Sequence, residues 1–437
     1  MDPGAEGTET MIHTKNATLL EFLVFPGLAM SLGWGLRGFI GGGPLGAMIP
    51  GAMVALALCL LLRHKPGTTG LAAAFGAVGV GFGGEMTYGE TVGFALDPST
   101  TIWGLAGLAA KGAVWGSLGG TVLGTGLLRA KHARTDICAA AVLMLACTWA
   151  GWRFVNVPKL LYFSRSRPEV WAGLLLGALA WCGCLCARSR RAEIALFALA
   201  GMLGGGIGFG SGGAVYALAR RVGLDRPFDF WKVMEFTFGL CFGVALGLIA
   251  WHLRHRLAEA ATASEEAGRG VARWRELSFV VLLLAGAFWL EAWLPLRFSY
   301  AAVGAALICV LLFRPAFSWH VALTMTICAF ALDLAEYWGI ERKLGDPAVG
   351  WAAAVIFSLA ICGLVFFRDG RGGITAAWAF SLLMWSAVAV SWLKSAIHPR
   401  WTVAQVVVQA IFTAMALTLA WMVRGSLRRP PEAARGA

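Results

Sequence analysis

The chain has 437 residues, of which 58% are hydrophobic and 14% are charged, and its mean hydropathy is +0.71. This composition excludes an ordinary soluble domain, and the short alternating strands that would indicate a transmembrane β-barrel are absent. The net charge of +12 is dispersed among the expected loops, so it favours contact with anionic membrane lipids and not with nucleic acid.

Apolar runs of about 20 residues, the length needed to cross a bilayer core, recur along the chain. The sequence therefore predicts an all-α, polytopic transmembrane helical bundle of about fourteen spans. The spans expected at 277–295 and 299–313 have almost no loop between them, because only Pro295 and Arg297 interrupt the apolar sequence there. The spans are expected at 18–36, 45–62, 70–94, 103–128, 136–153, 169–187, 194–218, 231–252, 277–295, 299–313, 317–339, 349–367, 373–393 and 402–423.

Both termini are expected on the cytoplasmic side of the plasma membrane, specifically a bacterial inner membrane. The first sixteen residues are acidic and lack the basic segment of a cleavable signal peptide, so the first span is expected to serve as its own anchor. Loops on the side of the termini hold most of the Lys and Arg residues, which the positive-inside rule places in the cytoplasm. This side would include a disordered N-terminus at 1–17, a linker at 256–276 and a basic tail at 425–437.

Internal repetition predicts how the spans are grouped. A glycine stripe occurs in the fourth and eighth expected spans, and a similar glycine-rich sequence precedes it in each case. Each unit has four spans, an even number, so the copies would be parallel repeats. The repeats are expected at 18–131 and 132–255, with a degenerate third at 277–367 and two further spans at 368–424. The matching positions are Gly116, Gly120 and Gly124 with Gly239, Gly243 and Gly247, VGFGG (80–84) with IGFGS (207–211), and, in the third copy, Gly350, Ala354, Ser358 and Cys362.

The glycine stripe predicts close helix packing. Gly112, Gly116, Gly120 and Gly124 recur every four residues, which on a helix gives a groove without side chains. Apolar helices gain little from associating in lipid, so small-residue stripes of this kind are how they pack tightly. A leucine in place of Gly116 or Gly120 is expected to overpack the interface.

Charged residues inside apolar runs are the first candidates for a site. Glu85 and Glu90 lie in the span expected at 70–94, and Lys111 lies at the start of the glycine stripe. A carboxylate at membrane depth needs a partner, a proton or water. The two acids could carry protons or bind a cation; alternatively, one forms a structural ion pair, for which Lys111 is the expected partner and Arg37 the other candidate.

A second candidate lies in the sequence GWGLRGFIGGGPLGAMIPGAM at 33–53, whose eight glycines and two prolines cannot all fit an undisturbed helix. Irregular backbone at membrane depth is stable only where protein or a water-filled cavity provides hydrogen bonds for its N–H and C=O groups. Arg37 lies in this break, close to an expected helix start after Pro44, a combination that favours an anion such as a carboxylate or phosphate. The alternative is that Arg37 reaches the outer headgroups.

The sequence GWGLRGF (33–39) followed by GGPLGA (42–47) resembles a G-W-x-L-x-G-x-x-x-G-P stretch of YeeE/YedE-type sulfur-compound transporters. The resemblance covers little over ten residues. The cysteine that those proteins carry in this stretch is missing here, where Ile40 and Gly41 stand, and no expectation about function is drawn from it.

The expected outer loops of the second repeat are rich in charge, against the positive-inside rule. Arg153 and Arg165 are the residues expected to admit an anionic ligand or a lipid headgroup, and surface salt bridges are the alternative. Many of the Trp residues, including Trp34 and Trp231, fall near span ends and are typical of an interfacial belt. The other charged residues here are Lys159, Arg167, Glu169, Arg220, Arg221, Asp225, Arg226, Asp229 and Lys232.

Several chemistries lack a sequence signal. No histidine pair has metal- or haem-ligand spacing within a span, and Cys182, Cys184 and Cys186 alternate in a way that suits no tetrahedral zinc site. There is no P-loop and no dinucleotide-binding glycine motif. No metal and no cofactor is therefore expected.

These observations favour an integral membrane transporter or channel-like protein with a midplane site at glycine-lined broken helices, for a small anionic or lipid-like solute. The residues expected at that site are Arg37, Glu85, Glu90 and Lys111, with Arg153 and Arg165 at the entrance. One alternative is a membrane-embedded enzyme acting on a lipid-linked anionic substrate. Another is a non-catalytic subunit that forms a homo-oligomer or binds a partner through its glycine grooves.

Overall fold

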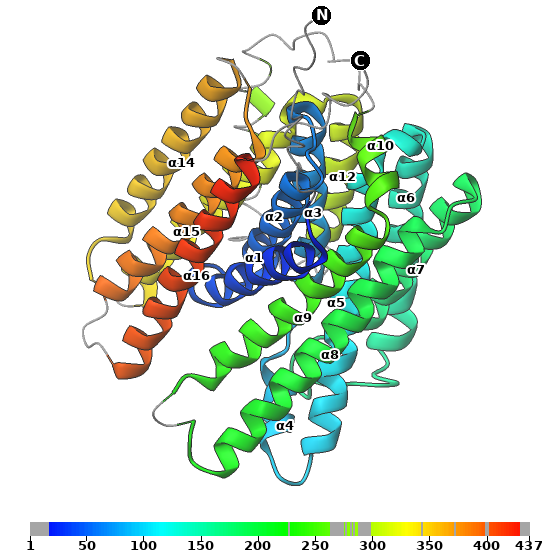
Figure 1. Cartoon of the computed structure of the whole chain (residues 1–437). Coiled ribbons are helices and arrows are strands. Elements are labelled where there is room, and N and C mark those ends of the chain that lie inside the picture. Colours follow the sequence, from blue (N-terminus) through cyan, green and yellow to red (C-terminus); the bar gives the residue numbers. More distant parts are fainter. Residues whose placement is uncertain are drawn as a thin grey trace, which may run out of the picture.

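The computed structural model describes residues 17–225, 228–262, 299–341, 344–370, 373–397 and 402–428, with isolated positions between 275 and 286. Every regular element in these residues is a helix (Figure 1). Ten of the described helices are long and apolar enough to cross a membrane. The chain therefore has the helical, polytopic architecture of a membrane protein, as its composition predicts.

The helices follow the expected spans closely at most positions. In the first half they are α1 (Leu19–Ile40), α2 (Gly43–Leu61), α3 (Pro66–Gly83), α4 (Gly89–Leu96), α5 (Thr101–Leu127), α6 (Arg134–Gly151), α7 (Trp171–Ser189), α8 (Glu193–Arg221), α9 (Phe230–His252) and α10 (Arg254–Thr262). In the second half they are α12 (Ser299–Phe313), α13 (Thr326–Glu336), α14 (Pro347–Gly370), α15 (Ala376–Ile397) and α16 (Val403–Leu427). π-Helical turns follow α6 at Trp152–Asn156 and flank α13 at His320–Met325 and Tyr337–Glu341.

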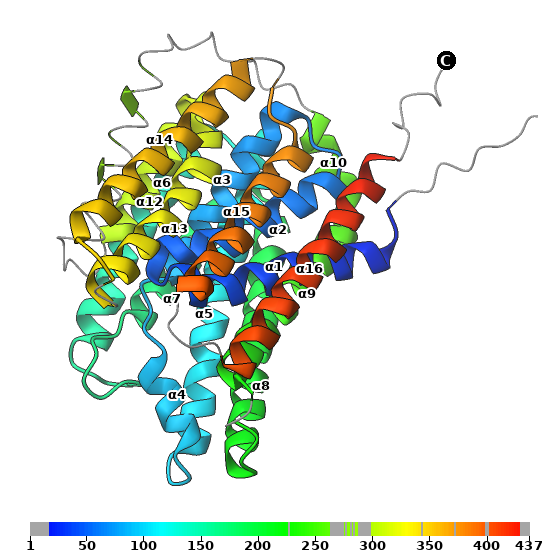
Figure 2. The ribbon, with the colours of Figure 1, turned by 90° about the vertical axis from the view of Figure 1, so that its left-hand side faces the viewer.

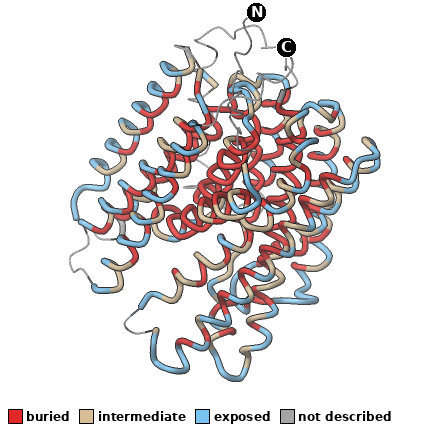
Figure 3. Tube along the Cα trace, viewed as in Figure 1, coloured by how far each residue is buried: buried red, intermediate tan, exposed pale blue. Residues whose placement is uncertain are grey.

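The centre of the bundle is formed by α1, α2 and α3, where buried residues concentrate (Figure 3). In α2, 89% of the most apolar window is buried, against 28% in α14 and 33% in α16, which lie at the outside. Viewed from the side, α4 and the adjoining ends of α5 and α8 project beyond the rest of the molecule, at the end away from α10 (Figure 2). The central helices are therefore shielded from the surroundings by their own chain.

The glycine stripe of α5 packs on α8, which confirms the predicted close approach. A methyl group added at Gly116 would collide with the carbonyl oxygen of Gly201, and one at Gly120 with that of Phe197. The second stripe, on α9, packs on α1 in the same way, since a methyl group at Gly247 would collide with the carbonyl oxygen of Phe22. Both grooves are filled within the chain; association with another subunit stays a prediction.

Two interruptions place helix ends inside the bundle. The backbone breaks between α1 and α2, where Gly43 has φ +62°, a left-handed conformation that glycine adopts without strain. It breaks again between α3 and α4. The span expected at 70–94 is therefore wrong as a single helix: residues 84–88 form a turn that separates two helices. Pro44, Gly43 and Gly84 bring the two breaks together, because a methyl group at Gly84 would collide with the backbone of Pro44.

Part of the predicted organisation stays a prediction. The described helices do not establish fourteen spans, because α3 and α5 are not among the ten helices that are long and apolar enough to cross a membrane, and the expected span at 277–295 lies mostly outside the described residues. The N-terminus at 1–16, residues 263–274 of the linker and the tail beyond 428 also lie outside them. Sidedness and the parallel repeats are likewise untested.

Candidate anion-binding cleft

A cleft of about 530 Å³ opens where the two backbone breaks meet. It lies among the end of α1, the start of α2, the α3–α4 turn and the first turns of α9. Five of its twelve lining residues are glycines, so backbone forms much of the wall. The lining residues are Arg37, Gly38, Gly42, Gly43, Gly84, Met86, Thr87, Tyr88, Gly89, Arg167, Trp231 and Glu235.

Arg37 lies in the last turn of α1 and is only 4% exposed. Its Nη1 donates a hydrogen bond to the Tyr88 hydroxyl at 3.2 Å, and its Nη2 donates to the carbonyl oxygen of Gly43 at 3.3 Å. Its Nε is buried without a hydrogen-bond partner among the described residues. The guanidinium carbon lies 4.9 Å from the ring centre of Trp115 and 5.3 Å from that of Trp34, distances typical of cation–π contacts. The alternative that Arg37 reaches the headgroups is therefore wrong, because protein encloses its side chain.

Glu235 is the acid of the cleft, and its side chain is fully buried. Its Oε1 accepts hydrogen bonds from the Tyr88 hydroxyl at 3.0 Å and from Trp231 Nε1 at 2.9 Å. Its Oε2 pairs with Lys232 Nζ at 2.6 Å. The Tyr88 hydroxyl thus bridges the two charges, because it accepts a hydrogen bond from Arg37 and donates one to Glu235. Gly38 leaves room for this carboxylate, since a methyl group there would collide with both of its oxygens.

The cleft has an unbalanced charge. Arg37 and Lys232 are buried cations, whereas Glu235 is the only carboxylate among the lining residues and is already paired with Lys232. No acidic side chain in the described part of the chain lies within ion-pair distance of Arg37. A buried cation without a counter-charge is costly, so the site favours an anion.

Two helix starts add to this preference. α2 begins at Gly43 and α4 at Gly89, and neither helix has a side chain that caps its first N–H groups. Both starts line the cleft, so free N–H groups and the positive ends of two helix dipoles lie beside Arg37. Helix starts combined with arginine are a common arrangement for binding carboxylate or phosphate groups.

Arg37 places the cleft at the level of the middle of α5. Trp115, against which Arg37 packs, is close to the middle of α5, a helix of 27 residues or about 40 Å. This length exceeds the roughly 30 Å of a bilayer core. α1 and α3 end at this level while α5 and α8 continue past it, which is the broken-helix arrangement that the glycine pattern indicated.

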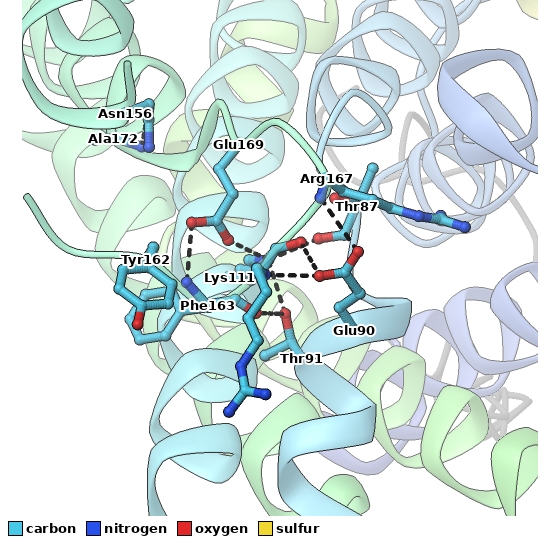
Figure 4. Close-up of polar contacts among 12 residues, drawn as sticks. Thr87, Glu90, Thr91, Lys111, Asn156, Tyr162, Phe163, Arg167, Glu169 and Ala172 are labelled. Atoms are coloured by element: carbon cyan, nitrogen blue, oxygen red, sulfur yellow. Dashed lines mark hydrogen bonds and ion pairs between the residues drawn. The ribbon is translucent and has the colours of Figure 1, made fainter. Parts of the chain in front are cut away.

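Lys111 belongs to a different polar cluster. Its Nζ pairs with Glu169 at 2.8 Å and donates hydrogen bonds to Thr91 Oγ1 and the carbonyl oxygen of Thr87 (Figure 4). The side chains of Lys111 and Glu169 are 1% and 5% exposed. The predicted ion pair of Lys111 with Glu85 or Glu90 is therefore wrong, because the loop after α6 brings Glu169 to Lys111 instead.

Glu90 holds the same loop at a second point. Its carboxylate accepts hydrogen bonds from the backbone N–H groups of Arg165, Ser166 and Arg167 at 2.7, 3.1 and 3.2 Å. It also accepts bonds from the hydroxyls of Ser164 and Ser166. Glu90 thus contacts the segment that carries Arg165, at the edge of the cleft.

The other predicted site residues lie elsewhere. Glu85 is in the α3–α4 turn, where its Oε1 accepts the backbone N–H of Ala301 at 3.0 Å, in the first turn of α12. This contact is a helix cap. Arg153 is exposed on the π-helical turn after α6 and does not line the cleft. Arg165 is exposed too, and its guanidinium carbon lies 5.2 Å from the ring centre of Phe94.

Of the six predicted residues, the structure places Arg37 in the cleft and brings Glu90 and Arg165 together at its edge. Sequence reasoning missed Tyr88, Glu235 and Trp231. Glu235 carried a usable signal, as an acid in an apolar run three residues after Lys232. The interpretation of Trp34 as an interfacial residue is wrong, because Trp34 is fully buried against Arg37, and Trp231 lines the cleft and donates to Glu235.

Comparison of the chain with protein-family models, with curated proteins and with solved structures finds no match. The short resemblance at 33–47 thus has no support from a family model. Among the described residues, no group of three His, Cys, Asp or Glu side chains is arranged to hold a metal ion. The chemistry of the cleft is therefore argued from its own residues.

Proposed function

We propose that this protein is a membrane transporter or channel-like protein for a small anion, which binds in the cleft beside Arg37. The observation that carries the proposal is the buried guanidinium with an unpartnered Nε and no carboxylate within ion-pair distance among the described residues. An anion in the cleft supplies the missing charge and accepts hydrogen bonds from Arg37 and from the free N–H groups of α2 and α4. Carboxylates and tetrahedral oxyanions both fit this donor set.

The position of the cleft supports transport over catalysis. It lies where helices end near the middle of α5 and α8, the arrangement in which many transporters bind their substrates. An enzyme of this kind needs a free carboxylate as a general base. Glu235, the acid that lines the cleft, is held by Tyr88, Trp231 and Lys232 and is poorly placed for that role.

Flux measurements in proteoliposomes test the proposal. Wild-type protein and the Arg37→Met variant are compared for uptake of labelled phosphate, sulfate and small carboxylates. Hydrogen bonds to a charged group contribute about 1.5–3 kcal/mol, so flux of the transported anion at low concentration should fall about 10- to 100-fold in Arg37→Met. Arg153→Met is the matched control, because it removes an exposed arginine away from the cleft and should leave flux unchanged. Equal loss in both variants, or no Arg37-dependent flux of any of these anions, would overturn the proposal.

A further inference from the structure

The segment Ser164–Arg167 lies at the edge of the cleft and forms a site for a negatively charged group. Three successive backbone N–H groups, those of Arg165, Ser166 and Arg167, converge on the carboxylate of Glu90. The hydroxyls of Ser164 and Ser166 point at the same carboxylate. Successive N–H groups that converge in this way form an anion-binding concavity known as a nest.

The group that fills the nest in this structure is a side chain of the same chain, the carboxylate of Glu90. Glu90 is at the start of α4, next to Gly89 of the cleft wall, and Arg167 contributes both an N–H group to the nest and a side chain to the cleft lining. The Arg167 side chain points away from Glu90 (Figure 4), so the backbone, and not the guanidinium, holds the carboxylate. The nest and the cleft are therefore neighbouring sites, because residues 89–90 at the start of α4 and residue Arg167 of the loop contribute to both.

The charges around the nest also favour an anion. Arg165 and Arg167 carry the nest, and Lys159 Nζ donates a hydrogen bond to the carbonyl oxygen of Arg165 at 2.7 Å. Two acids besides Glu90 lie nearby: Asp97 interacts electrostatically with Arg165, and Glu169 accepts the backbone N–H of Phe163 and is paired with Lys111. Hydrogen bonds from the Ser166 hydroxyl, and from the Ser166 N–H, the Ser164 hydroxyl and the Arg165 N–H, lower the pKa of Glu90 to about 2, so the occupant is ionised at neutral pH.

We propose that the Ser164–Arg167 nest is a second binding site, specific for oxyanions such as phosphate groups, and that the Glu90 carboxylate occupies it until an incoming oxyanion displaces it. Displacement frees the loop from α4 at the edge of the cleft. We further infer that the nest passes its anion to the cleft, and this part rests on the proposed function. The affinity of the nest for an oxyanion does not depend on that function. The phosphate group can come from free phosphate or from a lipid headgroup.

Binding of labelled inorganic phosphate in detergent tests the nest separately from the cleft. Arg37→Met removes the buried cation of the cleft, and in this variant phosphate can bind only by displacing Glu90 from the nest, so saturable binding should persist but be weaker than in the wild type. Arg37→Met/Glu90→Ala empties the nest and should bind phosphate about tenfold more tightly than Arg37→Met alone. Adding Ser166→Pro removes one N–H group and one hydroxyl and should abolish the gain, whereas Ser166→Ala keeps the N–H and should retain part of it. If Ser166→Pro prevents folding, Ser164→Ala/Ser166→Ala in the same background should weaken this tighter binding.

The possible outcomes separate the two proposals. No binding to Arg37→Met/Glu90→Ala, together with Arg37-dependent binding to the wild type, would overturn the nest and leave the cleft intact. Binding to the double variant without any Arg37-dependent binding to the wild type would support the nest and contradict the proposed function. In nanodiscs, the same double variant shows whether the phosphate group comes from a lipid headgroup or from free phosphate. If headgroups fill the nest, phosphatidylglycerol should suppress phosphate binding relative to phosphatidylcholine. If free phosphate fills the nest, the two lipids should give equal phosphate binding.

Discussion

Arg37 and Lys111 are both buried cations in glycine-rich helices, yet their surroundings differ. Lys111 has a carboxylate, a hydroxyl and a carbonyl oxygen as partners, so its charge and its donors are satisfied. Arg37 has a hydroxyl, a carbonyl oxygen and aromatic rings, but no acid among the described residues, and it borders an open cleft. A balanced pair fixes structure, whereas an unbalanced cation beside a cleft favours a ligand. The comparison shows that embedded charge by itself does not identify a binding site.

The largest effect should come from breaking the balanced pair. Glu169→Ala leaves Lys111 buried without its counter-charge, which typically costs about 3–5 kcal/mol of folding free energy. Chemical unfolding in mixed micelles measures this cost. The matched control is Asp136→Ala, which breaks the exposed pair with Arg188 and should cost at most about 1 kcal/mol. Equal costs for the two variants would mean that the Lys111 pair is not structural.

A smaller loss is expected from Gly116→Leu, because the side chain would meet the backbone of α8 at Gly201. Overpacking of this kind costs about 1–3 kcal/mol, and more where backbone must move. Gly363→Leu is the control, since Gly363 of α14 is exposed and has no atom near the added Cβ position. The same unfolding measurement applies, and a Gly116→Leu protein as stable as Gly363→Leu would contradict the packing described for α5 and α8.

Removing single hydroxyls sharpens the comparison between the two cations. Tyr88→Phe and Thr91→Val each delete one group that bonds a buried cation, and each should lower stability by about 1 kcal/mol. Only Tyr88→Phe should also change anion affinity, because Tyr88 lines the cleft and Thr91 does not. Titration with the transported anion decides this. A larger change of affinity in Thr91→Val than in Tyr88→Phe would contradict the assignment of the two clusters.

The smallest effect concerns pH and the Glu90 contact. The pKa of this carboxyl is lowered from 4.5 to about 2, so its contribution to loop stability is complete above about pH 4.5 and is lost only as the pH falls through about 2. Hydrogen exchange of a peptide spanning 164–167, corrected for intrinsic rates, should show unchanged protection from pH 7 to pH 4. Glu90→Gln should reduce protection already at pH 7. Loss of wild-type protection between pH 5 and pH 4 would contradict the account.

Local patterns in the sequence predicted the helical architecture, the glycine-mediated packing and the break that holds Arg37. These features depend on composition, on spacing along one helix and on backbone preferences of Gly and Pro. The partners of the embedded charges could not be predicted in this way. Glu169 reaches Lys111 through an irregular loop, and Tyr88 meets Glu235 across 147 positions of sequence. Such pairs depend on how helices cross in space, which the pattern of a single span does not encode.

Anion-dependent stabilisation of the purified protein tests the unbalanced charge at Arg37 most directly. Thermal unfolding is followed with and without each anion of the transport panel, for wild type, Arg37→Met and Arg153→Met. An anion that binds only the folded state at 100 times its dissociation constant stabilises by about 2.7 kcal/mol. We predict that at least one anion stabilises wild type and Arg153→Met equally and leaves Arg37→Met unaffected. Equal stabilisation of all three proteins, or of none, would contradict an anion site at Arg37.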